Sequence, residues 1–77
     1  AFSRSGLIQQ LKYEGYSRAD ASFAADAVHA DWNEQAGKAA EEYLSMTWFS
    51  RSGLIQQLMY DGYTRSQAEH GASQAGL

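Results

Sequence analysis

Apolar residues recur three and four positions apart in five stretches of this chain, the spacing that places them on one face of an α-helix. The clearest examples are Leu7, Ile8 and Leu11 and, much later, Leu54, Ile55 and Leu58. Proline is absent, alanine is frequent, and no run of β-branched residues favours a strand. We therefore predict an all-α chain. The predicted helices span residues 4–14, 18–30, 32–45, 50–61 and 65–76.

The segment FSRSGLIQQL occurs twice, at residues 2–11 and at residues 49–58. The similarity continues through YEGYS after the first copy and YDGYT after the second, so the chain carries an internal duplication. Each copy is predicted to form two helices joined by a tight turn. The repeat motif consists of Phe2, Ser3, Leu7, Leu11, Gly15 and Tyr16 in the first copy, and of Phe49, Ser50, Leu54, Leu58, Gly62 and Tyr63 in the second.

Local signals place the ends of these helices. Ser3 and Ser50 are positioned as N-caps, and the phenylalanine before each is positioned to pack on a leucine of the first turn. Gly15 and Gly62 suit the left-handed position after a helix, where the following tyrosine folds back onto the last turn. Thr47 is an alternative cap that begins the second copy one turn earlier.

The second helix of each copy is predicted to bury a stripe of small residues. The inward positions are Ala21, Ala24, Ala25 and Val28 in the first copy, and Ala68, Gly71, Ala72 and Ala75 in the second. Small side chains on such a stripe let two helix axes approach closely. We expect the aromatic residues, including Trp48 and the tyrosines, to lie mostly in the core.

The helix between the two copies has no counterpart elsewhere in the chain. Asp31 and Glu34 give it an N-terminal capping signal, and Trp32 begins its apolar stripe and is predicted to point inward. We predict that this helix packs against both copies. The expected division is a first repeat at residues 1–30, a shared acidic helix and link at 31–48, and a second repeat at 49–77. On this view the first repeat lacks a preceding helix, so that another molecule, including a second copy of the chain, can cover its exposed face.

The net charge of −3 conceals an uneven distribution. Seven acids and only two basic residues lie between residues 14 and 42. Clustered lysine and arginine are what phosphate binding requires, so nucleic acid is disfavoured as a partner. We predict a protein-binding acidic surface, with solubility as the simpler explanation of the same charges. Its residues are Asp20, Asp26, Asp31, Glu34, Glu41 and Glu42.

Catalytic, metal and membrane-spanning functions find no support in the residue pattern. Cysteine is absent, and His29 and His70 stand alone without ligands at useful spacing, so we predict no metal and no cofactor. Glu41 and Glu42 are adjacent and point about 100° apart on a helix. The serines lack a neighbouring base and act as caps. We predict no enzyme, and no apolar run approaches the roughly 18 residues needed to span a bilayer.

The succession of FSRSGLIQQL, YEGYS, DWNEQA, EEYL, FSRSGLIQQLMYDGYT and AEHG resembles the Ltp family of host cell surface-exposed lipoproteins. The resemblance covers nearly the whole chain and implies tandem helix-turn-helix-like units. It further implies display on the outer face of the cytoplasmic membrane of a Gram-positive bacterium, through a lipid anchor outside these 77 residues. Prophage-encoded members are superinfection-exclusion proteins that block DNA injection by a second phage, engaging the tail tape-measure protein through an acidic surface. Many chromosomal relatives have no assigned role.

A second interpretation rests on the Gly15-Tyr16-Ser17 turn followed by Ala21 and Ala25. This stretch resembles the glycine-aromatic loop of ubiquitin-associated three-helix domains, which bind an apolar patch of a partner protein. The resemblance implies a small helical peptide-binding or protein-binding domain with a different role at the host surface. Binding through this turn would not depend on the acidic residues, so charge reversal separates the two hypotheses.

Overall fold

The computed structural model describes residues 1–28 and 30–77, and within these ranges every regular element is a helix. The helices are α1 (Arg4–Tyr13), α2 (Arg18–Ala27), α3 (Trp32–Met46), α4 (Arg51–Tyr60) and α5 (Arg65–Gln74). The predicted all-α class is confirmed. α2 ends at Ala27, three residues before the predicted end at residue 30; of these three, His29 lies outside the described residues.

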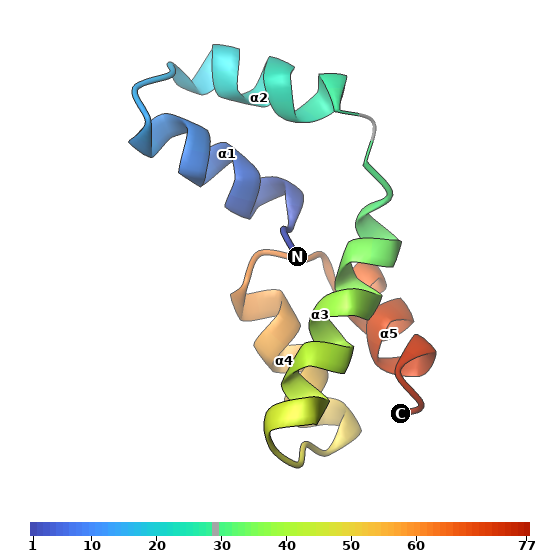
Figure 1. The fold of residues 1–77 in the computed structure, drawn as a ribbon. Helices are drawn as coiled ribbons and strands as arrows, with labels where there is room; N and C mark the ends of the chain where they lie inside the picture. Colours follow the sequence, from blue (N-terminus) through green and yellow to red (C-terminus); the bar gives the residue numbers. More distant parts are fainter. Residues whose placement is uncertain (29) are drawn as a thin grey trace.

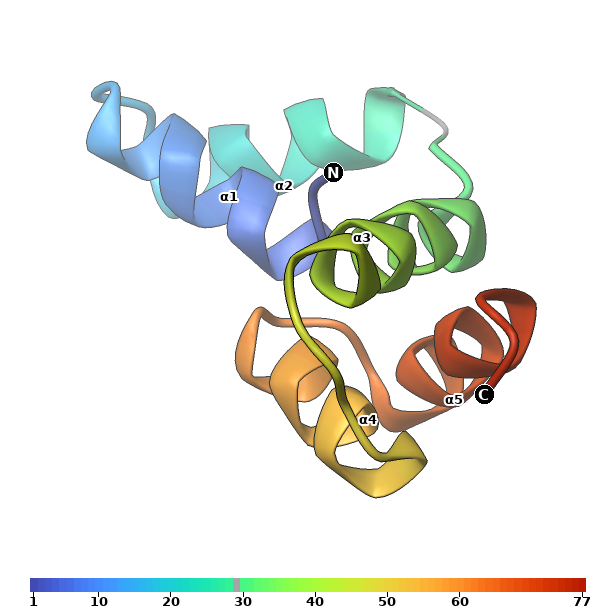
Figure 2. The same cartoon turned by 60° about the horizontal axis from the view of Figure 1, so that its bottom comes forward.

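The helices form two groups (Figure 1). α1 and α2 make a hairpin, and α3, α4 and α5 make a three-helix bundle in which α3 packs chiefly on α5 (Figure 2). The hairpin has its own small apolar cluster of Ile8, Ala21 and Ala25. The larger cluster belongs to the bundle and consists of Ala36, Ala39, Ala40, Leu54, Ile55, Leu58, Tyr63, Ala68 and Ala72. The molecule is elongated, with extents of 37 × 20 × 18 Å.

The predicted N-caps are confirmed. The Ser3 hydroxyl accepts the Gly6 N–H at 2.9 Å, and the Ser50 hydroxyl accepts the Gly53 N–H at 3.0 Å. α4 therefore begins after Ser50, and Thr47 instead ends α3 as its C-cap. These side chains satisfy backbone donors that the first helical turn leaves without partners.

Both hairpins turn at a glycine with a positive φ, 108° at Gly15 and 106° at Gly62. The Tyr16 N–H donates to the Leu11 carbonyl and the Tyr63 N–H to the Leu58 carbonyl, each at 3.1 Å, which is the closure predicted for both copies. The two turns are thus the same structure built twice.

Small residues set the distance between α3 and α5. A Cβ added at Gly71 would lie 2.7 Å from the Ala36 carbonyl oxygen, so only glycine fits this crossing. The predicted small inward positions Ala68, Gly71 and Ala72 are all buried. Backbone thus packs against backbone, and the bundle core is thin and alanine-rich.

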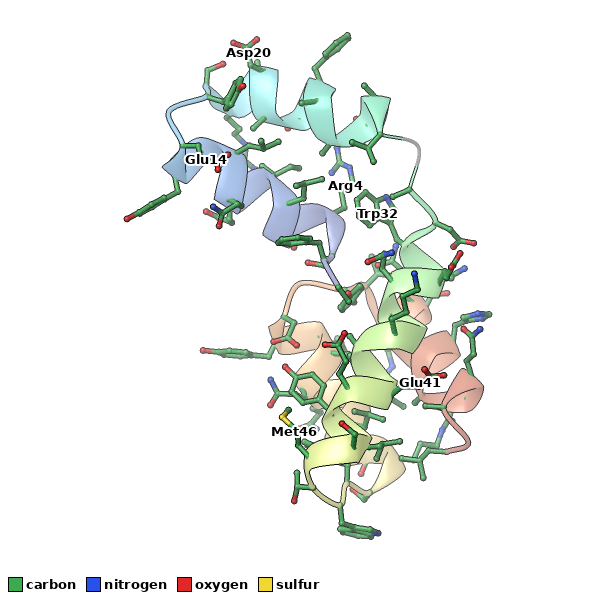
Figure 3. All side chains as sticks on the ribbon, in the orientation of Figure 1. Arg4, Glu14, Asp20, Trp32, Glu41 and Met46 are labelled. Carbon is green, nitrogen blue, oxygen red and sulfur yellow. The ribbon has the colours of Figure 1, made fainter. Side chains whose placement is uncertain are left out.

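The prediction that the central helix packs on both copies is wrong. α3 packs on α4 and α5. Among the described residues, α3 is hydrogen-bonded to the segment before α1 through the Phe2 N–H, which donates to Gln35 Oε1 at 3.3 Å. Within residues 1–28 and 30–77 no third helix packs over the hairpin, and Val28 is exposed, contrary to its predicted inward position. Phe2 is exposed as well, whereas Phe49 packs against the bundle core. Trp32 is only half-buried and stands at the first turn of α3, on the side toward the hairpin (Figure 3).

Candidate binding surface

The outer face of α3 carries the acids that the sequence places in the middle of the chain. Because α3 buries Ala36, Ala39 and Ala40 against α4 and α5, its charged residues face solvent. Glu34 pairs with Lys38 across one turn at 3.5 Å, and both side chains are more than half exposed. Such an exposed pair contributes little to stability, so the fold does not depend on it.

An open hollow lies beside this face, between α3 and the end of α4. Its volume is about 210 Å³, and its lining residues are Ala1, Ala39, Glu42, Tyr43, Met46 and Asp61. It therefore combines two carboxylates with an apolar floor. Glu41 and Met46 project from different sides of α3, so Glu41 lies outside the hollow (Figure 3).

Hydrogen bonds fix one wall of the hollow. The Tyr43 hydroxyl donates to the Asp61 carboxylate, and the Gln57 amide donates to both the Tyr43 oxygen and Asp61, each at 3.3 Å. The bond to Asp61 raises the pKa of Tyr43, because ionisation would remove the donated proton. The Tyr43 ring also meets Phe49 edge-to-face, with centroids 5.7 Å apart. Asp61 is therefore held in one orientation.

Tyr63 lies beneath this wall, in the bundle core. Its side chain is 4% exposed, and its hydroxyl is buried without a hydrogen-bond partner among the described residues. Burial raises the pKa of Tyr63 to about 12, and the nearby Asp61 and Glu42 charges act in the same direction. This tyrosine is structural, and it remains neutral at physiological pH.

The six predicted surface acids do not form one continuous patch. Asp20 lies at the outer end of α2, far from Glu41 on α3 (Figure 3). Asp26 accepts two hydrogen bonds from Arg4, at 2.8 and 3.1 Å, and this contact lowers the pKa of Asp26. Asp31 caps α3 by accepting the Glu34 N–H at 3.1 Å. Glu34, Glu41 and Glu42 remain as the exposed group on α3, and their binding role stays a prediction.

Sequence reasoning missed Asp61 as part of an acidic site. Asp61 is the C-cap of α4 and stands 19 positions after Glu42, outside the acidic stretch. The two carboxylates meet only because α3 and α4 pack antiparallel. The chain offers no local signal for this pairing.

Several aromatic side chains expected in the core are on the surface. Trp48 is 82% exposed in the link between α3 and α4, and Tyr13 and Tyr60 are exposed at corresponding positions of the two copies. They stand at helix ends or in the link, where no other element covers them. These residues give the surface apolar contact area beside its charges.

Among the described residues, no three His, Cys, Asp or Glu side chains lie close enough together to hold a metal ion. None of the helices in residues 1–28 and 30–77 is long and apolar enough to cross a membrane.

Comparison with protein-family models supplies a match. Residues 31–74 match the family model Lipoprotein_Ltp, described as host cell surface-exposed lipoprotein. The matched segment contains all of α3, α4 and α5, which is the three-helix bundle. No curated protein and no solved structure matches the chain.

Proposed function

Because this chain belongs to the host cell surface-exposed lipoprotein family, we propose that it is the binding module of an extracytoplasmic lipoprotein that blocks phage DNA injection. In this proposal a lipid anchor holds the module on the outer face of the cytoplasmic membrane of a Gram-positive bacterium. The module binds a tail protein of the incoming phage, such as the tape-measure protein. Binding alone produces the effect, and no catalytic step is involved.

The observation that carries the proposal is the hollow between α3 and α4. Glu42 and Asp61 provide negative charge at its edge, and Met46, Ala39 and the Tyr43 ring provide apolar surface. A lysine or arginine side chain matches both features, since its aliphatic stem packs on apolar surface while its charge remains at the rim. The proposed ligand is therefore a basic, amphipathic helical segment.

The charge on α3 adds a kinetic advantage to this contact. Glu34, Glu41 and Glu42 are exposed, so they interact with a basic segment mainly over distance. Such charges speed encounter and are screened by salt, whereas apolar contact in the hollow slows release. A tail protein that passes the membrane surface only briefly needs rapid capture.

A direct test is to display the anchored protein in a sensitive host and to measure phage adsorption and DNA entry separately. The expected result is normal adsorption with reduced DNA entry. Normal DNA entry for every phage tried would overturn the exclusion role.

Two neighbouring charge reversals sharpen the test. Glu42→Lys changes the hollow, and Glu41→Lys changes an adjacent exposed residue outside it. We expect Glu42→Lys to weaken binding of a basic tail-protein peptide by about tenfold or more at low salt, and Glu41→Lys to have a smaller effect that salt removes. Equal effects of the two variants would contradict a specific role for the hollow.

The ubiquitin-associated-like alternative uses the first glycine turn instead. Tyr16 is 53% exposed in that turn, and a Cβ added at Gly15 would meet nothing within 4 Å. This alternative predicts that Tyr16→Ala abolishes capture of a host surface protein and that Glu42→Lys leaves capture intact. The opposite pattern supports the exclusion proposal.

A further inference from the structure

The two groups of helices meet through a contact between the start of one copy and the turn of the other. The Ser3 hydroxyl donates to the Asp61 carbonyl oxygen at 2.8 Å, and the Ser5 hydroxyl donates to the Gly62 carbonyl oxygen at 3.0 Å. Ser3 is only 3% exposed as a result. We call Ser3 and Ser5 the first serine pair, and residues 61–63 the second glycine turn.

Gly62 is required at this contact for reasons of space as well as backbone conformation. A Cβ added there would lie 2.6 Å from the Ser3 hydroxyl oxygen and would collide with the Ser5 hydroxyl oxygen. The serine pair therefore occupies the place that any other side chain at position 62 would fill. This is a fitted contact between the two copies of the repeat.

The duplication supplies a second serine pair with the same local structure. Ser50 caps α4 just as Ser3 caps α1, and its hydroxyl lies 3.4 Å from that of Ser52, compared with 3.5 Å in the first pair. Ser50 and Ser52 are both exposed. The donor half of the contact is thus formed a second time and faces solvent.

The duplication also supplies a second acceptor half. Residues 14–16 form the first glycine turn, whose φ at Gly15 differs by only 2° from that at Gly62. The C-cap backbone is also alike, with φ and ψ of −79° and 0° at Glu14 against −74° and −5° at Asp61. The space beside Gly15 is open, whereas the corresponding space beside Gly62 is filled by the first serine pair.

We propose that a second copy of this chain docks its second serine pair on the first glycine turn, repeating between molecules the contact seen within one. The Ser50 hydroxyl would donate to the Glu14 carbonyl oxygen and the Ser52 hydroxyl to the Gly15 carbonyl oxygen. Because donor and acceptor lie on different parts of each chain, the association is head-to-tail. Each added molecule leaves one free pair and one free turn, so the assembly is open-ended.

The intermolecular contact is weaker than the internal one. Within the chain, the Phe2 N–H also donates to Gln35 of α3, and in the part of the chain that the structure describes no third helix packs on the first hairpin to offer an equivalent acceptor. Because both halves of the internal contact belong to one chain, their effective concentration is also higher than that of two separate molecules. We therefore expect weak self-association, with a dissociation constant of about 1 mM.

Sedimentation and native mass spectrometry of the purified chain test this directly. Wild-type protein is expected to gain average mass with concentration. Ser52→Ala removes a donor but not the cap, and Gly15→Asn fills the turn with a side chain that tolerates positive φ better than most others. Each variant alone is expected to associate about tenfold more weakly, the effect of one lost hydrogen bond or a blocked site.

Mixing the two variants gives the decisive result. Gly15→Asn keeps an intact serine pair and Ser52→Ala keeps an intact turn, so the mixture should form one-to-one pairs and no longer assemblies. Ser5→Ala is the matched control, since it makes the same change in the first copy and should leave self-association intact. Wild-type protein that stays monomeric, or variants that associate as wild type does, would overturn the proposal. Wild-type protein that stops at the mass of a dimer would also overturn it, since a two-fold symmetric dimer is closed and leaves no free pair or turn. None of these measurements involves phage, so the result is independent of the exclusion role.

Discussion

The two hairpins have nearly the same sequence and very different surroundings. Tyr63 is 4% exposed and its counterpart Tyr16 is 53% exposed. Leu54 and Leu58 are fully buried, whereas Leu7 and Leu11 are only half-buried. The difference arises because α3 covers the second hairpin and leaves the first uncovered.

Two substitutions between the copies explain why α3 packs on one hairpin. Gly71 of α5 accommodates the Ala36 backbone, and the corresponding residue of α2 is Ala24, whose methyl group would occupy that space. One turn later, Ala75 corresponds to the larger Val28. The copies therefore share their caps and turns but differ on the face that receives a third helix. Close helix packing depends on single methyl groups.

The largest expected effect is from a cavity in the bundle. Leu54→Ala should lower the free energy of unfolding by about 2–5 kcal/mol, the usual range for a fully buried leucine. Leu7→Ala, the identical change in the uncovered hairpin, should have a clearly smaller effect. Urea denaturation followed by circular dichroism measures both, and equal losses would show that the hairpins are equally packed in solution.

The second largest effect on stability is expected at the contact between α3 and α5. Gly71→Ala is expected to destabilise by about 1–3 kcal/mol, because overpacking against the Ala36 backbone outweighs the gain in helix propensity. The reverse change, Ala24→Gly, should cost only the propensity difference of about 1 kcal/mol. Thermal unfolding of the two variants compares them. A Gly71→Ala protein more stable than wild type would contradict the close crossing.

The two glycine turns provide the next comparison. Gly15→Ala and Gly62→Ala both place a side chain at positive φ, which costs about 1–2 kcal/mol. Gly62→Ala should cost about 1–3 kcal/mol more, since it also breaks the two hydrogen bonds from Ser3 and Ser5. The difference between their unfolding free energies measures the contact between the copies. If the difference is absent, the serine pair does not hold the turn in solution.

The smallest effect appears only at high pH. Unfolded tyrosine ionises near its ordinary pKa of 10.0, while the pKa of Tyr63 is about 12, so between these values the folded chain retains a proton that the unfolded chain has lost. Stability should be complete below pH 10 and fall as pH rises toward 12. Tyr63→Phe should reduce this slope at little cost at neutral pH, with Tyr16→Phe as the matched control. Denaturation midpoints across this pH range give the answer, and an unchanged slope would contradict burial of the Tyr63 hydroxyl.

Local chemistry accounts for what could be predicted about the elements. Ser3 and Ser50 cap their helices as expected, and Gly15 and Gly62 turn as expected. Each cap and turn depends on contacts between residues a few positions apart, so it can be predicted from the amino-acid sequence alone. The same rules failed for Trp48 and Val28, whose burial depends on a partner helix that the local pattern does not specify.

The candidate site was only partly predictable for the same reason. The acids of α3 were identified from charge, but the hollow requires Glu42 and Asp61 to meet across two helices, and their separation in the chain hides this.

By itself, the sequence determined five helices, their caps and turns, the duplication and the family, because these follow from short-range hydrogen bonding and a repeated motif. Only the tertiary structure decided which hairpin α3 covers, which of two identical serine pairs is engaged, and where the hollow forms. Those outcomes depend on the fit between surfaces distant in the chain, such as the space at Gly71 that a single methyl group would fill.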